Sequence, residues 1–162
     1  MALRTQKRRR LERKTDYKLR LGLLKSGLKR IVLRKTNKYV TLQIVESLEA
    51  KDKVLMGVSS KELLKSGWDK KFSGSLKSIP AAYLTGILLA KKADKKGDYI
   101  VDIGMSINKR GGRLYSAIKG LIDGGVNIRA SKEVFPSEER LNGEHLKEDV
   151  KKMILKVREK IK

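Results

Sequence analysis

The sequence contains no cysteine, a single histidine and only two prolines. The absence of cysteine excludes disulfide bonds, thiolate nucleophiles and cysteine-ligated zinc. With His145 as the one histidine, the sequence lacks the several histidines of a histidine-rich metal site, and a typical catalytic triad is not expected. No stretch approaches the roughly 18 consecutive apolar residues of a membrane span. The basic N-terminus is followed by neither an apolar run nor a cleavage site of small residues, so we expect a soluble, cytoplasmic protein.

Acidic residues are also scarce, because 18 Asp and Glu face 40 Lys and Arg, which gives a formal net charge of +22 over 162 residues. Residues 1–38 alone hold 15 Lys and Arg and only two acidic residues, Glu12 and Asp16. Such a surplus repels itself and is usually kept for a polyanionic partner. Nucleic acid and an anionic membrane are the two candidates. Its concentration in one segment favours an arm that contacts phosphates.

The arm begins with a run of basic residues, from Arg4 to Lys14, that we expect to be disordered on its own. Behind it, Thr15 is a plausible helix N-cap, and Gly27 is a plausible end. The apolar residues between them recur at helical spacing, which leaves Arg20 and Lys25 on the opposite face and available to phosphates.

Alternation, helical periodicity and glycine positions predict an α/β fold with a mixed sheet, made of an antiparallel meander followed by helix–strand–helix units and packed with helices. We expect a basic N-terminal arm and helix over 1–29, an α/β RNA-binding core over 30–129, and an extension over 130–162 with an amphipathic helix. The first predicted elements are strands at 30–34, 39–45 and 53–58, followed by a helix at 60–66 capped by Ser60 and a loop at 67–74. A helix at 78–92 capped by Ser78 then leads to a buried central strand at 99–103 and a helix at 114–122. An edge strand at 126–128 and a helix from about 143 to the end complete the prediction.

Motifs for catalysis are weak. Residues 22–27 have the glycine spacing of a phosphate-binding Walker loop but lack its following Lys and Ser/Thr, so a helix end is the better interpretation. Asp98 and Asp102 share one face of their strand, yet no further ligand joins them, and salt bridges are the favoured role. The lone His145 is interpreted as a capping or surface residue. We therefore expect no catalytic residue, no metal and no cofactor.

Two loops carry signals for RNA. Residues 109–113 (KRGGR) combine glycines, which permit close backbone approach, with three cations just before a helix, and this favours a phosphate contact. In the loop at 67–74, Trp68 and Phe72 flank two lysines, and the rings either stack on unpaired bases or pack internally. Both alternatives remain open from the sequence.

Further residues carry a family resemblance. The matching stretches are 15–27 (TDYKLRLGLLKSG), 30–38 (RIVLRKTNK), 67–68 (GW), 80–86 (PAAYLTG), 102–104 (DIG), 135–140 (FPSEER) and 142–145 (NGEH). In this combination and order the chain resembles the archaeal-type form of the universal large-subunit ribosomal protein family numbered eighteen, the binder of 5S ribosomal RNA.

The resemblance implies a non-enzymatic role in the central protuberance, where this family joins 5S rRNA to the large-subunit body. The implied partners are 5S rRNA, the 23S-type large-subunit rRNA and neighbouring ribosomal proteins, with neither a membrane nor a small-molecule substrate. The alternatives are an RNA-processing enzyme and a membrane-surface protein. Together with the charge pattern, the resemblance indicates as RNA-binding residues Arg8, Arg9, Arg10, Arg13, Lys14, Tyr17, Arg20, Lys25, Arg34, Lys35, Thr36, Asn37, Lys38, Trp68, Lys70, Arg110 and Arg113.

Overall fold

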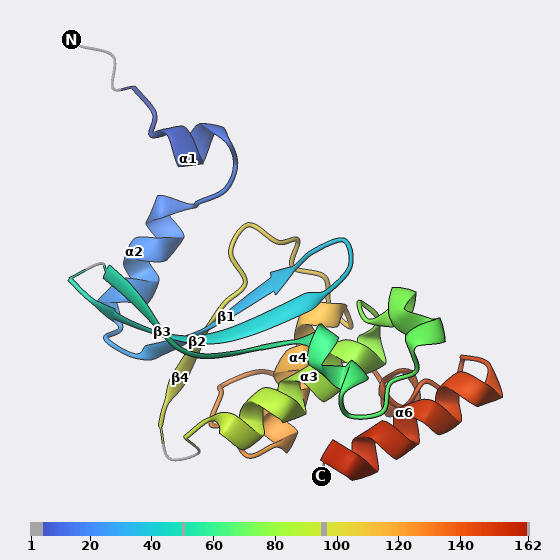
Figure 1. Ribbon diagram of the computed structural model, residues 1–162. Helices are drawn as coiled ribbons and strands as arrows, with labels where there is room; N and C mark the ends of the chain where they lie inside the picture. The colour runs from blue at the N-terminus through green and yellow to red at the C-terminus, as the bar shows by residue number, and fades with distance from the viewer. Residues whose placement is uncertain (1–4, 50, 95–96, 162) are drawn as a thin grey trace.

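A four-stranded mixed sheet organises the chain, for which a computed structural model describes residues 5–49, 51–94 and 97–161 (Figure 1). The strand order is β3-β2-β1-β4, with β1–β2 and β2–β3 antiparallel and β1–β4 parallel. This confirms the predicted α/β class with a mixed sheet. The strands are β1 (Lys29–Lys35), β2 (Val40–Leu48), β3 (Lys51–Ser59) and β4 (Tyr99–Asp102).

Alternation along the strands separates the two faces of the sheet. On β1, Ile31 and Leu33 are fully buried against helices α3 (Ile79–Lys92) and α4 (Arg113–Asp123). Arg30 and Arg34 are offset from them by one residue and therefore point to the other face. Figure 1 shows that α3 and α4 cover one face, whereas α2 (Tyr17–Lys25) lies on the opposite side of the sheet.

Helices α3 and α4 pack with their backbones in close approach. A Cβ atom added at Gly86 would lie 2.2 Å from the carbonyl oxygen of Ala117, and one at Gly120 would lie 2.1 Å from that of Tyr83. Neither position has room for a side chain, so these two glycines set the distance between the helices. Ser78 caps α3 as predicted, because its side chain accepts a hydrogen bond from the backbone N–H of Ala81.

The C-terminal part packs on the far side of α3. Helix α6 (Glu148–Ile161) buries Met153, Ile154 and Val157 in a second core cluster that also contains Trp68. The predicted start of this helix near residue 143 is wrong, because Gly143 has φ +75° and ends the short helix α5. The remaining short elements of the chain are α5 (Glu138–Asn142) and the 3-10 helices η1 (Ser60–Leu64), η2 (Lys70–Ser75) and η3 (Lys132–Val134).

The N-terminal arm is described from residue 5, so Arg4 lies outside the described residues. Where we expected disorder, the structure has one helical turn, α1 (Arg8–Leu11), which buries none of its residues. Asp16 caps α2 by accepting hydrogen bonds from the N–H groups of Lys18 and Leu19, so the prediction of Thr15 as the cap is wrong. A carboxylate one residue later reaches the same helix terminus.

Three further predictions need correction. The strand at 99–103 is not central, because β4 lies at the edge of the sheet beside β1. The strand at 126–128 is reduced to one bridge between Asp98 and Asn127. The helix expected at 60–66 is the 3-10 helix η1, capped by Ser59 rather than Ser60, because Ser60 accepts a hydrogen bond from the N–H of Val40. Within the described ranges, no helix has the length and apolar character needed to span a membrane.

Candidate nucleic-acid interface

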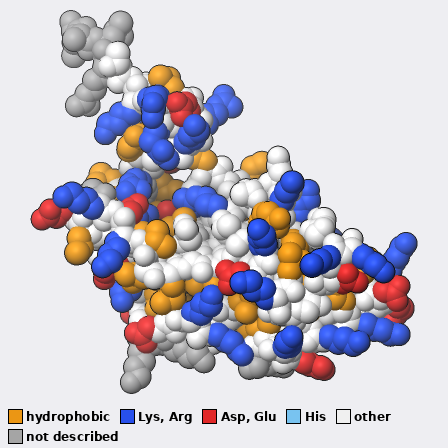
Figure 2. Space-filling model, in the orientation of Figure 1, with side chains coloured by type: hydrophobic (Ala, Val, Ile, Leu, Met, Phe, Trp, Pro, Cys, Tyr) orange, Lys and Arg blue, Asp and Glu red, His pale blue; other side chains and the backbone are white. Residues whose placement is uncertain are grey.

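The arm presents cations to solvent on all its sides. Every residue of α1 is exposed, including Arg8, Arg9 and Arg10, and Figure 2 shows this part as a projection crowded with Lys and Arg. In the described part of the arm before α2, Glu12 is the acidic residue that forms ion pairs, with Arg8 at 3.6 Å and with Lys14 at 2.8 Å. Exposed pairs of this kind contribute little to stability, so the arm retains a large positive surplus for a partner.

Four predicted RNA-binding cations converge where the arm meets the sheet. Arg9, Lys14, Arg20 and Arg34 come from the arm, α2 and β1, and they line a cleft of about 120 Å³. We call this the arm cleft; its other lining residues are Thr15, Asp16, Leu19, Leu23, Asp102 and Gly104.

Arg34 is held at the edge of the arm cleft by the end of β4. Its Nη1 donates to the carbonyl oxygens of Leu33 at 2.8 Å and Asp102 at 2.9 Å, and its Nη2 lies 3.3 Å from Asp102 Oδ1. Gly104 makes room for this guanidinium, because a Cβ there would lie 2.9 Å from Arg34 Cζ. The Arg34 side chain is nevertheless 45 % exposed, so it is both fixed and accessible.

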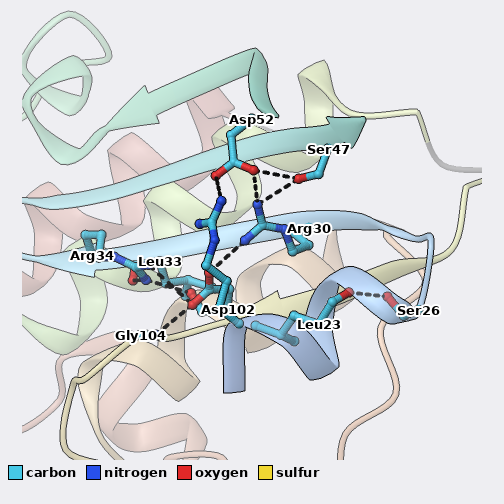
Figure 3. Close-up of polar contacts among 10 residues, drawn as sticks. Leu23, Ser26, Arg30, Leu33, Arg34, Ser47, Asp52, Asp102 and Gly104 are labelled. Carbon is cyan, nitrogen blue, oxygen red and sulfur yellow. Dashed lines mark hydrogen bonds and ion pairs between the residues drawn. The ribbon is translucent and has the colours of Figure 1, made fainter. Parts of the chain in front are cut away.

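A buried arginine joins the four strands behind this edge (Figure 3). Arg30 is 2 % exposed and contacts Asp102 Oδ2 at 3.1 Å, Asp52 Oδ1 at 2.7 Å and Ser47 Oγ at 2.8 Å. Arg20 of α2 reaches the same carboxylate, with Nη2 2.9 Å from Asp52 Oδ2. These contacts connect α2 and all four strands on the face that α3 and α4 leave open.

The charge of Asp52 is stabilised by its partners. Burial raises the pKa of this carboxyl, but the hydrogen bonds from Ser47, Arg20 and Arg30, together with the positive charge of Arg30, lower it by more. The net pKa therefore lies below the ordinary value, and Asp52 is ionised at neutral pH. An ionised Asp52 keeps both arginines in place.

The turn at 35–38 is exposed throughout. Thr36 forms this turn, because its Oγ1 donates to the carbonyl oxygen of Tyr39 at 3.0 Å and accepts from the N–H of Tyr39 at 2.9 Å. Lys35, Asn37 and Lys38 are therefore displayed on a defined turn. Tyr17 is half-buried beneath Lys7, whose Nζ lies 4.6 Å from the ring centre, and Lys25 is exposed at the end of α2, outside the arm cleft.

A second group of cations lines a pocket of about 340 Å³ whose wall includes residues of the loop at 103–112. Lys35, Lys109, Arg113 and Arg140 contribute to its wall, and none of them forms an ion pair within the part of the chain that the structure describes. Arg110 is exposed next to this pocket but does not line it. The predicted phosphate contact at 109–113 is thus accessible.

Trp68 requires a correction. Its ring is 2 % exposed inside the second core cluster, and its Nε1 donates to the carbonyl oxygen of Phe72 at 3.2 Å. A ring in this position is not available to stack on a base, so of the two open alternatives the structure has internal packing. Phe72 packs against the same cluster. Lys70, in contrast, is exposed at the start of η2.

The carboxylates singled out from the sequence make ordinary polar contacts. Asp98 accepts from Asn127, and Asp102 accepts from the two arginines of β1. Asp123, the last residue of α4, likewise accepts from Tyr83 at 3.0 Å and from Lys119 at 2.7 Å. In the described ranges no group of three or more His, Cys, Asp or Glu is arranged to hold a metal ion. His145 is exposed just before α6.

Sequence reasoning missed Arg30, Ser47 and Asp52. A signal for Arg30 was present, because Arg30 and Arg34 alternate with Ile31 and Leu33 and must share the face opposite the core. No local signal pointed to Ser47 or Asp52. They meet Arg30 only through the pairing of β2 with β3, in which Ser47 is opposite Asp52.

Known proteins resemble this chain over most of its length. Residues 2–99 match a family described as ribosomal large subunit proteins 60S L5 and 50S L18. The large ribosomal subunit protein uL18 of Korarchaeum cryptofilum is 46 % identical over 141 residues, which are 86 % of this chain and 70 % of that protein. The protein of the same name from Methanothrix thermoacetophila is 42 % identical over 160 residues, covering 95 % of this chain and 92 % of that protein.

Proposed function

Because the chain belongs to the family of ribosomal large subunit proteins 60S L5 and 50S L18, we propose that it binds 5S rRNA and attaches it to the 23S-type rRNA in the central protuberance. It is a protein of the large ribosomal subunit, and its partners are rRNA and other ribosomal proteins. The family is structural rather than catalytic. Its place of action is the cytoplasmic ribosome.

One observation carries the proposal: the arm cleft and the projecting arm bring cations from three separate parts of the chain onto one side. Arg and Lys neutralise phosphates and release counterions, which supplies affinity without reading sequence. Trp68 is internal and offers no ring on which a base could stack. Selectivity for 5S rRNA then comes from the match between its folded shape and the fixed positions of these cations.

We also propose a division of labour along the chain. The arm and α2, up to residue 29, carry most phosphate contacts, and the core over 30–129 holds them in register. The extension over 130–162 packs through α6 on α3 in the second core cluster, and so contributes mainly to the body of the protein.

A binding titration against two RNAs tests the proposed function. The full chain is titrated against 5S rRNA and against an RNA of the same length and composition but scrambled sequence, at several salt concentrations. We expect 5S rRNA to bind more tightly at every concentration, with an affinity that falls steeply as salt rises. The log–log slope should correspond to several phosphates, at about 0.7–0.9 for each.

Equal affinity for the two RNAs at all salt concentrations would contradict a specific role with 5S rRNA and leave general rRNA binding. A nearly flat salt response would contradict the phosphate contacts themselves.

A further inference from the structure

The arm cleft has three arginines, and each of them is tethered through only part of its guanidinium group. Arg9 donates from Nε to Thr15 Oγ1 at 2.9 Å, and Arg20 donates from Nη2 to Asp52. Arg34 uses Nη1 and Nη2 for its contacts with Leu33 and Asp102. A guanidinium has five N–H donors, so each arginine keeps donors that these contacts do not use.

The cleft has the size and charge for one phosphate group. Its volume of about 120 Å³ corresponds to only a few waters, each of which occupies about 30 Å³ in the liquid. Arginine is the side chain best matched to phosphate oxygens, because its planar fork donates two parallel hydrogen bonds. The lining and the network behind it together hold five cations, Arg9, Lys14, Arg20, Arg30 and Arg34. They face three carboxylates, Asp16, Asp52 and Asp102, which leaves a net charge of +2.

We propose that the arm cleft binds a single phosphate group of the RNA backbone, and that Asp52 and Asp102 are positioning residues which hold Arg20 and Arg34 ready for it. This inference rests on the proposed function. Both carboxylates also contact Arg30, which is buried, so their own positions are set by the sheet. On the arm side, Thr15 accepts a hydrogen bond from Arg9.

The carboxylates act by reducing the cost of ordering the arginines. A free arginine loses rotamer freedom when it binds phosphate, and an arginine already held in place loses less. If the carboxylates did nothing but lower the positive charge, removing one would tighten RNA binding. If they position the arginines, removing one weakens RNA binding although the protein becomes more positive. The two roles therefore predict effects of opposite sign.

The test compares Asp52→Asn and Asp102→Asn with the unmodified chain in binding to 5S rRNA. We expect each variant to bind about three- to tenfold more weakly, which corresponds to the free-energy cost of immobilising one long side chain on binding. Thr15→Val, which changes no charge, is expected to weaken binding similarly. Asp98→Asn is the matched control, because Asp98 is an exposed carboxylate near the other end of β4, accepts a hydrogen bond from Asn127 and does not line the arm cleft.

Folding of each variant is checked by thermal unfolding. If Asp102→Asn fails to fold because Arg30 is left unbalanced, Asp52→Asn and Thr15→Val decide the matter. Folded variants that bind as tightly as the unmodified chain, or more tightly, overturn the positioning role. Weaker binding of Asp98→Asn by the same factor overturns it as well, since the effect would then not depend on the cleft.

The ligand is identified by NMR of the arginine side-chain N–H groups during titration with inorganic phosphate and with 5S rRNA. Shifts of Arg9, Arg20 and Arg34 with both, or with RNA alone, support a backbone phosphate in the cleft. Shifts with inorganic phosphate but not with RNA overturn the RNA assignment and indicate a free-phosphate site. If 5S rRNA binds no better than scrambled RNA, the proposed function fails, whereas these shifts still decide whether the cleft binds phosphate.

Discussion

Arg30 and Asp102 lie on the same face of neighbouring parallel strands, with Arg30 Nη1 3.1 Å from Asp102 Oδ2 and only 2 % of the arginine exposed. This pair connects the edge strand β4 to β1. It also places Asp102 where its second oxygen reaches Arg34, at the edge of the arm cleft. A buried ion pair thus links the stability of the sheet to the surface that carries the cations.

Removing one partner of this pair is expected to destabilise the fold. Asp102→Ala leaves a buried arginine without one of its two carboxylates, so we expect the free energy of unfolding to fall by about 3 kcal/mol. Urea unfolding measures it. Asp98→Ala, near the exposed end of the same strand, should change it by less than about 0.5 kcal/mol. If Asp102→Ala has as small an effect as Asp98→Ala, the charge of Asp52 is sufficient to balance Arg30 and the prediction is wrong.

Two glycine substitutions are expected to change the free energy of unfolding in opposite directions, one at the contact between α3 and α4 and one in α2. Gly120→Ala places a methyl group 2.1 Å from the carbonyl oxygen of Tyr83, and we expect a loss of about 3 kcal/mol in the free energy of unfolding. Gly22→Ala in α2 meets no atom within 4 Å and should stabilise that helix by about 0.5–1 kcal/mol. Denaturant unfolding of both variants tests this, and equal stability of the two would contradict the close packing.

Stability at high pH should depend on Tyr83. Burial, the hydrogen bond to Asp123 and the charge of Asp123 raise its pKa from 10.0 to about 12. Because the folded-state pKa is the higher one, the stabilising contribution is fully present below pH 10 and is lost as the pH rises toward 12. We expect the free energy of unfolding to fall between pH 10 and 12 more steeply in the unmodified chain than in Tyr83→Phe. Identical slopes would count against the raised pKa.

Charges on the arm should contribute more to RNA affinity than the same number of charges elsewhere on the protein. Replacing Arg8, Arg9 and Arg10 by Gln removes three charges from a helical turn with no buried residue, so the fold should persist while affinity for 5S rRNA and its salt slope both fall. The matched control replaces Lys152, Lys156 and Lys160, which are exposed on α6. We expect a loss of at least about tenfold for the arm variant and a much smaller loss for the control.

Equal losses in these two triple variants would show that only the total charge matters. A loss of folded structure in the arm variant, seen by circular dichroism, would show that the arm contributes to the body of the protein.

Much of this protein follows from local sequence pattern. Alternation along β1 separates Ile31 and Leu33 from Arg30 and Arg34, because successive side chains of a strand point to opposite faces. Helical periodicity and the cap at Ser78 located α3 correctly. The charge surplus of residues 1–38 is a property of composition alone, and so is the expectation of a polyanionic partner.

Long-range pairing decided the rest. Asp52 and Asp102 are 50 positions apart in the numbering, yet both contact Arg30 because β3, β2, β1 and β4 lie in that order in one sheet. The sequence alone leaves Trp68 either stacking on a base or packing internally, and residues of α6 complete the cluster that buries its ring. Periodicity tells which side of an element is apolar, but only the packed chain determines which distant element covers it. Composition thus predicts a polyanionic partner, and the tertiary structure determines which arginines are held in fixed positions beside the arm.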